Sequence, residues 1–117
     1  MMMAKKTKQL ELLSPDDLND LMLEREFQRQ VTEYARLEGW SVYSIPDSRK
    51  VTLAGYPDLT MWRVSDRRLV FAELKREKGR VRPQQEAVLD ELRALGLAEV
   101  YLWRPSDWDE IVTTLSR

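Results

Sequence analysis

The most constraining feature of the sequence is a seven-residue stretch, Leu69 to Lys75, that is apolar until it ends in charge. Its length and the charged residues on both sides of it predict a buried β-strand. Side chains alternate between the two faces of a strand, so Glu73 and Lys75 fall on the same face as Phe71. Burying a charge without a partner is expensive, so this carboxylate and this ammonium group need either each other or a bound ion.

A second carboxylate is expected beside Glu73. Residues 59–64 are also strand-like, and residues 65–68 are typical of a hairpin turn. If the turn is centred on Ser65 and Asp66, Asp58 lies directly opposite Glu73, and the Cβ atoms of opposed residues are about 5 Å apart. Two carboxylates that close repel each other, and a divalent cation between them would remove the repulsion. A shift of one residue would place them on opposite faces, so this prediction depends on the turn.

The residue types that are absent narrow the chemistry. The chain has no Cys, which excludes disulfides, zinc–thiolate sites and thiol nucleophiles. It has no His, which excludes a Ser-His-Asp triad and His-ligated metals. None of its 4 Gly residues falls in a phosphate-binding pattern, so we expect no nucleotide cofactor. If the chain is an enzyme, carboxylates, Lys, Tyr and an oxygen-liganded metal such as Mg²⁺ remain.

The composition is that of one folded domain. The chain has 117 residues, 43% of them hydrophobic, which is enough for one core without disulfides. We expect residues 1–13 to be a flexible tail and residues 14–117 to be the domain. The net charge of −1 means that binding of nucleic acid would need a local patch of charge. No apolar run approaches about 18 residues and no signal peptide is recognisable, so we expect a cytoplasmic protein without a membrane segment.

Helix and strand signals alternate along the chain. Ser14 and Pro15 are typical of a helix start, and helical character continues to about residue 38, where Gly39 ends it. The pattern leaves open a break near Leu23 and Glu24. Strands are predicted at residues 40–45, 59–64, 69–75 and 98–103, and helices at 83–95 and 105–115. The order αβββαβα predicts a mixed α/β fold in one layered domain.

Two polar side chains are expected on the apolar faces of helices. Glu24 lies three residues before Phe27. Its carboxylate can either be solvated at the edge of the core or point toward Asp58 and Glu73 as a third acidic group. The sequence leaves both alternatives open. Gln85 lies on the inward side of the first turn of the helix 83–95, where it can simply be an N-terminal cap partner.

Two basic segments are candidates for contact with phosphates. The loop 46–54 carries Ser48, Arg49 and Lys50, which can either bind a phosphate or be solvated. The run from Lys75 to Arg82 has five basic residues and one acidic residue. Runs of charged residues are usually solvated loops, but this run begins at the predicted cation site. We therefore expect it to bind a polyanion. Its basic side chains after Lys75 are Arg76, Lys78, Arg80 and Arg82.

Taken together, Pro57-Asp58 and the later Glu73-Leu74-Lys75 resemble the PD-(D/E)XK pattern of the restriction-endonuclease-like superfamily. Their neighbours narrow the resemblance to the VRR-NUC family, the virus-type replication and repair nucleases. The segments that carry it are Glu24-x-x-Phe27-Gln28, Gly39-Trp40, Gly55-Tyr56-Pro57-Asp58-Leu59, Phe71-Ala72-Glu73-Leu74-Lys75, Gly79-x-x-x-Pro83-x-Gln85 and Tyr101-Leu102-Trp103-Arg104-Pro105. The resemblance implies a restriction-endonuclease-like core, in which helices flank a mixed central sheet.

The resemblance implies a phosphodiesterase that depends on Mg²⁺ or Mn²⁺. Asp58 and Glu73 would bind the metal, with the backbone carbonyl of Leu74 as a further ligand. Glu24 would complete the acidic cluster from the first helix. Hard carboxylate oxygens suit Mg²⁺, which keeps several of its waters and uses few protein ligands.

The resemblance also implies roles for two other side chains and for a partner. Lys75 would orient or deprotonate the attacking water, or offset charge on the pentacovalent phosphate. Gln85 would position Lys75 or the phosphate. Short, free-standing members of the family are similar to Holliday-junction resolvases and tend to act as dimers on branched DNA. We therefore expect a homodimer that cuts branched DNA, of phage or prophage origin.

Two other functions fit part of the pattern. One is a DNA-binding module with this fold but without catalysis, and Mg²⁺- or Mn²⁺-dependent cutting would exclude it. The other is a glycoside hydrolase, which also needs two carboxylates. The glycoside hydrolase gives no reason for Lys75 or for the basic run, and a strong salt dependence of DNA binding would argue against it.

Overall fold

The computed structural model describes residues 14–45 and 52–116, in the predicted order of helices and strands. The expected tail 1–13 and the loop residues Ser48, Arg49 and Lys50 lie outside the described residues. The elements in chain order are α2 (Pro15–Leu37), β1 (Ser41–Ser44), β2 (Leu59–Arg63), the 3₁₀ turn η2 (Val64–Asp66), β3 (Arg68–Leu74), α3 (Pro83–Leu95), β4 (Glu99–Trp103), the 3₁₀ turn η3 (Pro105–Asp107) and α4 (Trp108–Leu115).

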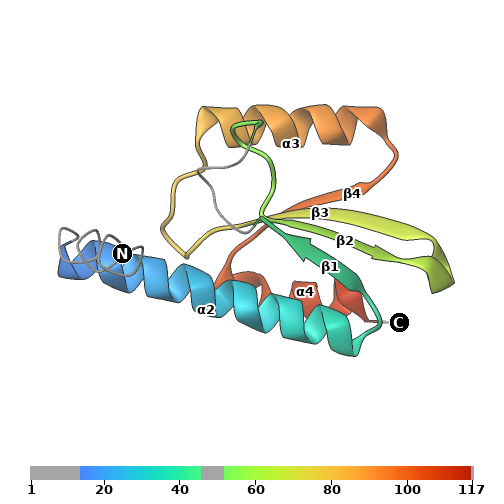
Figure 1. The fold of residues 1–117 in the computed structure, drawn as a ribbon, viewed down its shortest axis with the longest axis horizontal. Helices are drawn as coiled ribbons and strands as arrows, with labels where there is room; N and C mark the ends of the chain where they lie inside the picture. Colours follow the sequence, from blue (N-terminus) through green and yellow to red (C-terminus); the bar gives the residue numbers. More distant parts are fainter. Residues whose placement is uncertain (1–13, 46–51, 117) are drawn as a thin grey trace, which may run out of the picture.

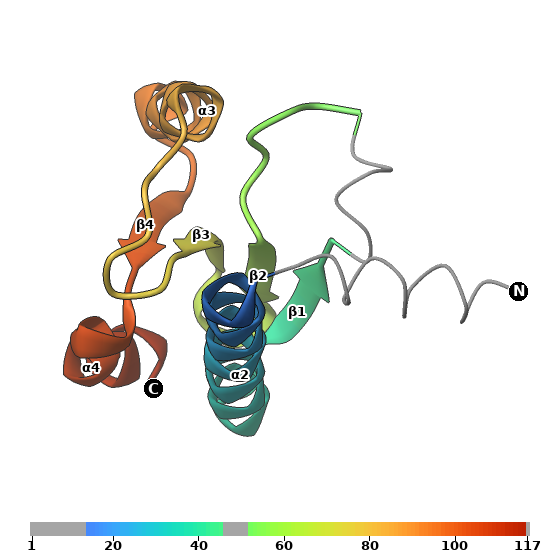
Figure 2. The same ribbon diagram turned by 90° about the vertical axis from the view of Figure 1, so that its left-hand side faces the viewer.

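The strands form one mixed sheet in the order β1-β2-β3-β4. The first three strands are antiparallel, and β4 pairs with β3 in parallel. Helix α3 is the crossover that two parallel strands require. Helices α2 and α4 lie on one side of the sheet and α3 lies on the other (Figures 1 and 2). The expected α/β core, a mixed central sheet flanked by helices, is confirmed.

The β2–β3 hairpin has the predicted register. Leu59 pairs with Ala72 and Arg63 pairs with Arg68, so the connection is centred between Ser65 and Asp66. The connection closes because Arg67 adopts a left-handed conformation, with φ 57° and ψ 44°. Each earlier residue of β2 therefore meets a defined partner in β3.

The core lies between the sheet and the pair α2 and α4. Helix α2 contributes Phe27, Val31 and Ala35, which recur every four residues and therefore share one face. The buried strand and α4 side chains that they meet are Leu59, Met61, Val70, Ala72, Leu74, Trp103, Ile111 and Leu115. Helix α2 has no break near Leu23, because its sequence contains no Gly or Pro after Pro15.

One buried cation joins the ends of several elements. The Arg63 side chain is almost fully buried (3% exposed) and donates to the carbonyl oxygens of Glu38 and Leu115, each at 2.8 Å. It also binds the carboxylate of Asp66 at 3.0 and 2.7 Å and lies 4.6 Å from the centroid of the Trp40 ring. The guanidinium group thus links the end of α2, the hairpin and the end of α4.

Replacing Arg63 by Ala tests this link. The change removes hydrogen bonds from a charged donor to three backbone carbonyls, those of Glu38, Leu115 and Ser116, so we expect the free energy of unfolding to fall by about 3 kcal/mol. Urea denaturation measures it. The control is Arg29→Ala, because the ion pairs of Arg29 with Glu26 and Glu33 are exposed. This substitution should leave the free energy of unfolding unchanged. Equal effects of the two substitutions would contradict the proposed link.

Candidate active site

The hairpin register brings Asp58 and Glu73 together. Extending the pairing of Leu59 with Ala72 by one residue places Asp58 opposite Glu73, on the sheet face away from α2. The N–H of Asp58 donates to Glu73 Oε1 at 3.2 Å, and the N–H of Leu74 donates to Asp58 Oδ2 at 2.8 Å. The predicted juxtaposition of the two carboxylates is confirmed.

The Glu73 carboxyl group is buried with one oxygen unsatisfied. The side chain is 1% exposed, and Oε2 has no hydrogen-bond partner among the described residues. The ammonium nitrogen of Lys75, Nζ, lies 3.8 Å from Oε2. Burial, reinforced by the hydrogen bond and the negative charge of Asp58, raises the pKa of Glu73 to about 9, although Lys75 acts in the opposite direction. A buried polar atom without a partner is costly, so this oxygen is suited to a ligand.

The donor set fits a hard divalent cation. Two carboxylates on one sheet face, one with a free buried oxygen, offer the ligands that Mg²⁺ or Mn²⁺ prefers. Among residues 14–45 and 52–116, no three acidic side chains lie close enough together to hold a metal. The described acidic site is therefore a pair, and the ligand roles of Glu24 and of the Leu74 carbonyl stay predictions.

Helix α2 reaches the loop after β3 near Glu24. Asp20 of α2 binds Arg76 at 3.2 Å, and Glu24 follows one helical turn later on the same face. The side chain of Glu24 is half-buried, between this contact and the buried Phe27. Glu24 thus lies in the part of α2 that is next to the end of β3.

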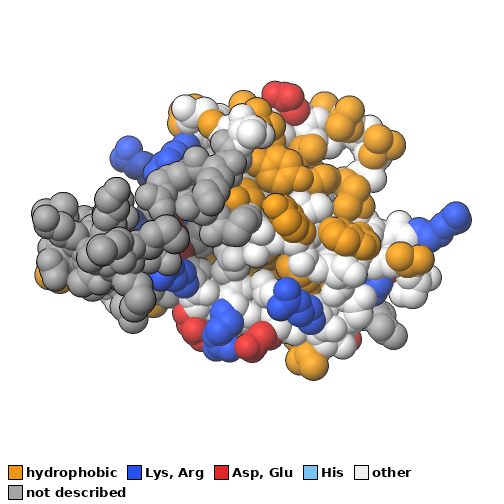
Figure 3. Space-filling view, viewed as in Figure 1, with side chains coloured by type: hydrophobic (Ala, Val, Ile, Leu, Met, Phe, Trp, Pro, Cys, Tyr) orange, Lys and Arg blue, Asp and Glu red, His pale blue; other side chains and the backbone are white. Residues whose placement is uncertain are grey.

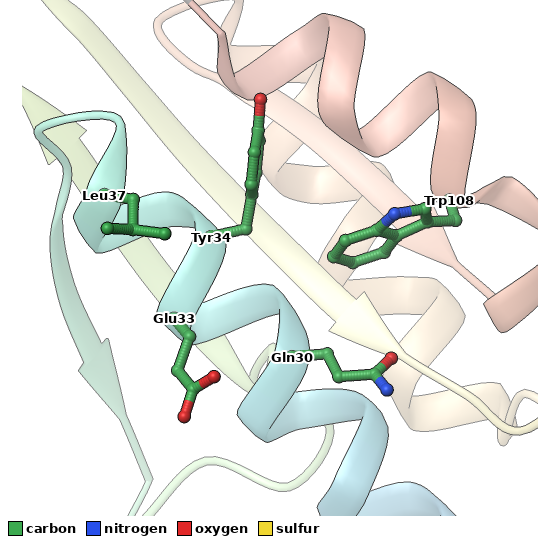
Figure 4. A pocket seen from close by; sticks show the side chains of 5 residues that line it. All are labelled: Gln30, Glu33, Tyr34, Leu37 and Trp108. Carbon is green, nitrogen blue, oxygen red and sulfur yellow. The ribbon is translucent and has the colours of Figure 1, made fainter.

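A pocket opens beside the acidic pair. Its volume is about 310 Å³, and it lies between the segment 54–56 and the first turn of α3. The residues that line it are Ile45, Ala54, Gly55, Tyr56, Asp58, Arg82 and Gln85. A pocket of about 400 Å³ lies elsewhere, where Tyr34 of α2 faces Trp108 of α4 (Figure 4). It has neither member of the acidic pair in its lining, so the pocket at Asp58 is the candidate site.

Gln85 has the capping role that the sequence allowed, and its role beside Lys75 or a phosphate stays a prediction. Its Oε1 accepts the N–H of Arg82 at 2.9 Å, which caps α3. This bond fixes the orientation of the side-chain amide, so its NH₂ group is left to donate within the pocket. Gly55 lies against the same turn with φ +89°, and a Cβ atom there would be 2.3 Å from the carbonyl oxygen of Gln84. Only glycine allows this close approach of the two walls.

The basic run after Lys75 divides into two parts. Arg76 is paired with Asp20. Lys78, Arg80 and Arg82 are exposed, and none of them makes an ion pair with another described residue. The three exposed side chains are therefore available to a polyanion, and Arg82 also lines the pocket at Asp58.

Sequence reasoning missed two residues near this site. Tyr56 lines the pocket, packs edge-on against Phe71 with ring centroids 6.1 Å apart, and its hydroxyl lies 3.1 Å from that of Thr60. The only signal for it was its place directly before Pro57-Asp58. Arg104 binds the loop after β3 through three backbone carbonyls, and no local pattern indicated that contact.

Comparison with known proteins agrees with this geometry. The family model of the VRR-NUC domain matches residues 17–102. The chain belongs to the VRR-NUC domain family. This is a nuclease family, so the VRR-NUC domain described here has a nuclease-type fold and belongs among hydrolases that act on nucleic acid.

Two solved structures are similar to this VRR-NUC chain. One, described as a VRR_NUC domain, has a TM-score of 0.61 at 20% identity and covers 77% of this chain and 94% of its own. The second, a VRR_NUC domain protein, has a TM-score of 0.52 at 17% identity and covers 79% and 84%. A search of curated protein sequences gives no match. No helix among the described residues is long and apolar enough to span a membrane.

The pKa of Glu73 predicts how the metal-free domain responds to pH. Because this pKa rises from 4.5 to about 9 on folding, the folded state holds a proton that the unfolded state releases. The stabilisation of the folded state by this proton is complete below pH 4.5, the pKa of the group in the unfolded chain. It is lost as the pH rises toward about 9. Glu73→Gln mimics the protonated group, so it should unfold at a higher temperature than wild type at about pH 8 in EDTA, with a flatter pH profile.

Glu99→Gln is a control of opposite sign. Its hydrogen bond with Arg68 lowers the pKa of Glu99, so the charged carboxylate stabilises the fold above its ordinary pKa. The Glu99 substitution should therefore lower the melting temperature under the same conditions. A Glu73→Gln protein that is less stable than wild type at alkaline pH would contradict the assignment of Glu73.

Proposed function

We propose that this VRR-NUC domain is a Mg²⁺- or Mn²⁺-dependent DNA endonuclease that hydrolyses phosphodiester bonds. The observation that supports it best is the buried, unsatisfied Oε2 of Glu73 beside the carboxylate of Asp58. Lys75 follows Glu73 on the same face of β3, and its amine lies beside that carboxyl group. The pocket at Asp58 is open to a substrate. An acid pair and an amine beside an open pocket are what phosphodiester hydrolysis requires from a chain without His.

Asp58 and Glu73 would hold the metal ion, which lowers the pKa of a bound water and neutralises phosphate charge. The ammonium group of Lys75 lies 3.8 Å from Glu73 Oε2, where it can offset negative charge that grows on the phosphate. The NH₂ group of Gln85 can donate to a phosphate oxygen in the pocket, because its Oε1 is held by Arg82. Lys78, Arg80 and Arg82 would bind the DNA backbone on either side.

Lys75→Ala separates catalysis from binding. We expect kcat for cleavage to fall by about 10²- to 10⁴-fold, because a positioned charge at the reacting phosphate is lost. The rise in melting temperature on addition of Mg²⁺, which reports metal binding, should remain, as should the affinity for DNA. Cleavage of a labelled duplex and thermal unfolding with and without Mg²⁺ measure these quantities.

Two further variants give the contrast. Lys78→Ala removes an exposed cation of the same type three residues away, so it should raise KM and reduce the salt dependence of binding while kcat stays close to wild type. Glu73→Gln should lose both the Mg²⁺-dependent stabilisation and turnover. Loss of metal binding in Lys75→Ala would contradict this division of roles.

We infer further that the domain acts as a homodimer on branched DNA. The support for this inference is an exposed apolar surface on the sheet face that carries Asp58. Tyr43 and Trp62 are 53% and 42% exposed there, and Leu97 after α3 is 80% exposed. Hydrophobic side chains gather between α3 and the sheet in Figure 3. A patch of this kind is suited to a second copy of the domain, which would place two sites on one branched substrate.

Trp62→Glu tests the dimer. We expect wild type to sediment as a dimer and Trp62→Glu as a folded monomer, because a charge in an apolar interface is costly. The control is Leu37→Glu, an exposed apolar side chain (82%) at the end of α2 on the other side of the sheet. A panel of duplex, single strand, flap, fork and four-way junction then compares cleavage by dimer and monomer. A monomeric wild type would contradict the dimer, and metal-dependent DNA binding without cutting would favour the non-catalytic module.

A further inference from the structure

The loop that follows β3 is tied to the end of β4 by Arg104. Its Nη1 donates to the carbonyl oxygens of Arg76 at 2.8 Å, Glu77 at 3.2 Å and Gly79 at 2.8 Å. The N–H of Gly79 donates to the carbonyl of Arg76 at 3.0 Å, so residues 76–79 form a tight turn. Three carbonyl groups of this turn therefore share one guanidinium nitrogen.

Parallel pairing explains why Arg104 lies there. Leu74 pairs with Trp103, and the N–H of Lys75 donates to the carbonyl of Trp103 at 2.9 Å, one residue beyond the end of β3. The first residue after β4 therefore lies next to the first residues after β3. The N–H of Arg104 is itself held by the Asp107 carboxylate at 2.9 Å. A planar guanidinium group suits several acceptors in one place better than the ammonium group of a lysine.

A second contact holds the same turn. The carboxylate of Glu77 accepts the N–H of Ser106 at 3.3 and 3.2 Å, again from the segment after β4. Both contacts act on residues 76–79, between Lys75 in the site and Arg80 in the exposed basic run. The position of this turn therefore affects the site on one side and the phosphate-binding side chains on the other.

We propose that Arg104 is a positioning residue of the nuclease site, acting through the turn 76–79. By holding this turn it keeps Lys75 beside Glu73 and presents Lys78 and Arg80 to DNA phosphates in one arrangement. The inference rests on the function proposed above. Because Arg104 orders the turn before DNA binds, DNA binding does not carry the entropic cost of ordering it. Arg104 therefore lowers KM. A misplaced Lys75 would in turn lower kcat.

The first arm of the test does not depend on nuclease activity. Trypsin cuts after Lys78 and Arg80 only where the chain can open, so its rate at these bonds reports how firmly the turn is held. We expect Arg104→Ala to be cut there at least about ten times faster than wild type, at a temperature at which thermal unfolding shows both proteins to be folded. The control is Arg93→Ala, which removes an exposed arginine paired with Asp90 on α3 and should be cut like wild type.

The second arm measures cleavage and binding of DNA. Arg104→Ala should raise KM and lower kcat, each by about tenfold or more, and should reduce the salt dependence of DNA binding in the metal-free protein. Arg104→Lys keeps the charge but not the planar donor group, so it should be intermediate in both arms. If Arg104→Ala does not fold, the Arg104→Lys protein is used for both arms.

The outcomes are distinguishable. Unchanged trypsin cleavage in a folded Arg104 variant would overturn the inference whatever the protein does to DNA. Faster trypsin cleavage with unchanged kcat and KM would show that the turn is held for stability alone, and would overturn the positioning role. A wild-type protein that binds metal but cuts no DNA would overturn the proposed function, while the trypsin arm would still decide whether Arg104 holds the turn.

Discussion

The structure of the site depends on one backbone constraint, the register of the β2–β3 hairpin. The connection between the strands is centred on Ser65 and Asp66, and that centre alone decides that Asp58 meets Glu73. A register shifted by one residue would place one carboxylate under α2 and the other under α3. The left-handed Arg67 and the contact of Arg63 with Asp66 both act on this connection, so they protect a register whose consequence lies at the far end of the hairpin.

A buried carboxyl group without a full set of partners costs stability, and Glu73 is such a group. The fold tolerates it because the Asp58 N–H satisfies one oxygen and because protonation or a cation can satisfy the other. The same burial that raises the pKa of Glu73 would strengthen the attraction of a bound cation, because water does not screen the charge there. Burial of the Glu73 carboxyl group thus both lowers the stability of the metal-free domain and strengthens its attraction for a cation.

The sheet topology brings the rest of the site to one place. The chain leaves β3 and β4 at the same end because these strands are parallel, so Arg104 meets the turn 76–79 although 25 or more residues separate them in sequence. The crossover α3 returns over the same sheet face and presents Gln85 to the pocket at Asp58. Gly55 completes the wall because it alone can approach the backbone of α3.

The sequence by itself determined the elements, the hairpin centre and the acid pair, because strand alternation, turn residues and helix caps act over a few neighbouring residues. It also indicated Gln85, whose cap position and inward face are both local properties. It could not indicate that Arg63 and Arg104 would each bind carbonyl groups from distant segments. Those contacts depend on which chain ends the sheet places together. Only the tertiary structure decides that, because a guanidinium group can satisfy any carbonyl within reach and its sequence neighbours do not reveal which one it will find.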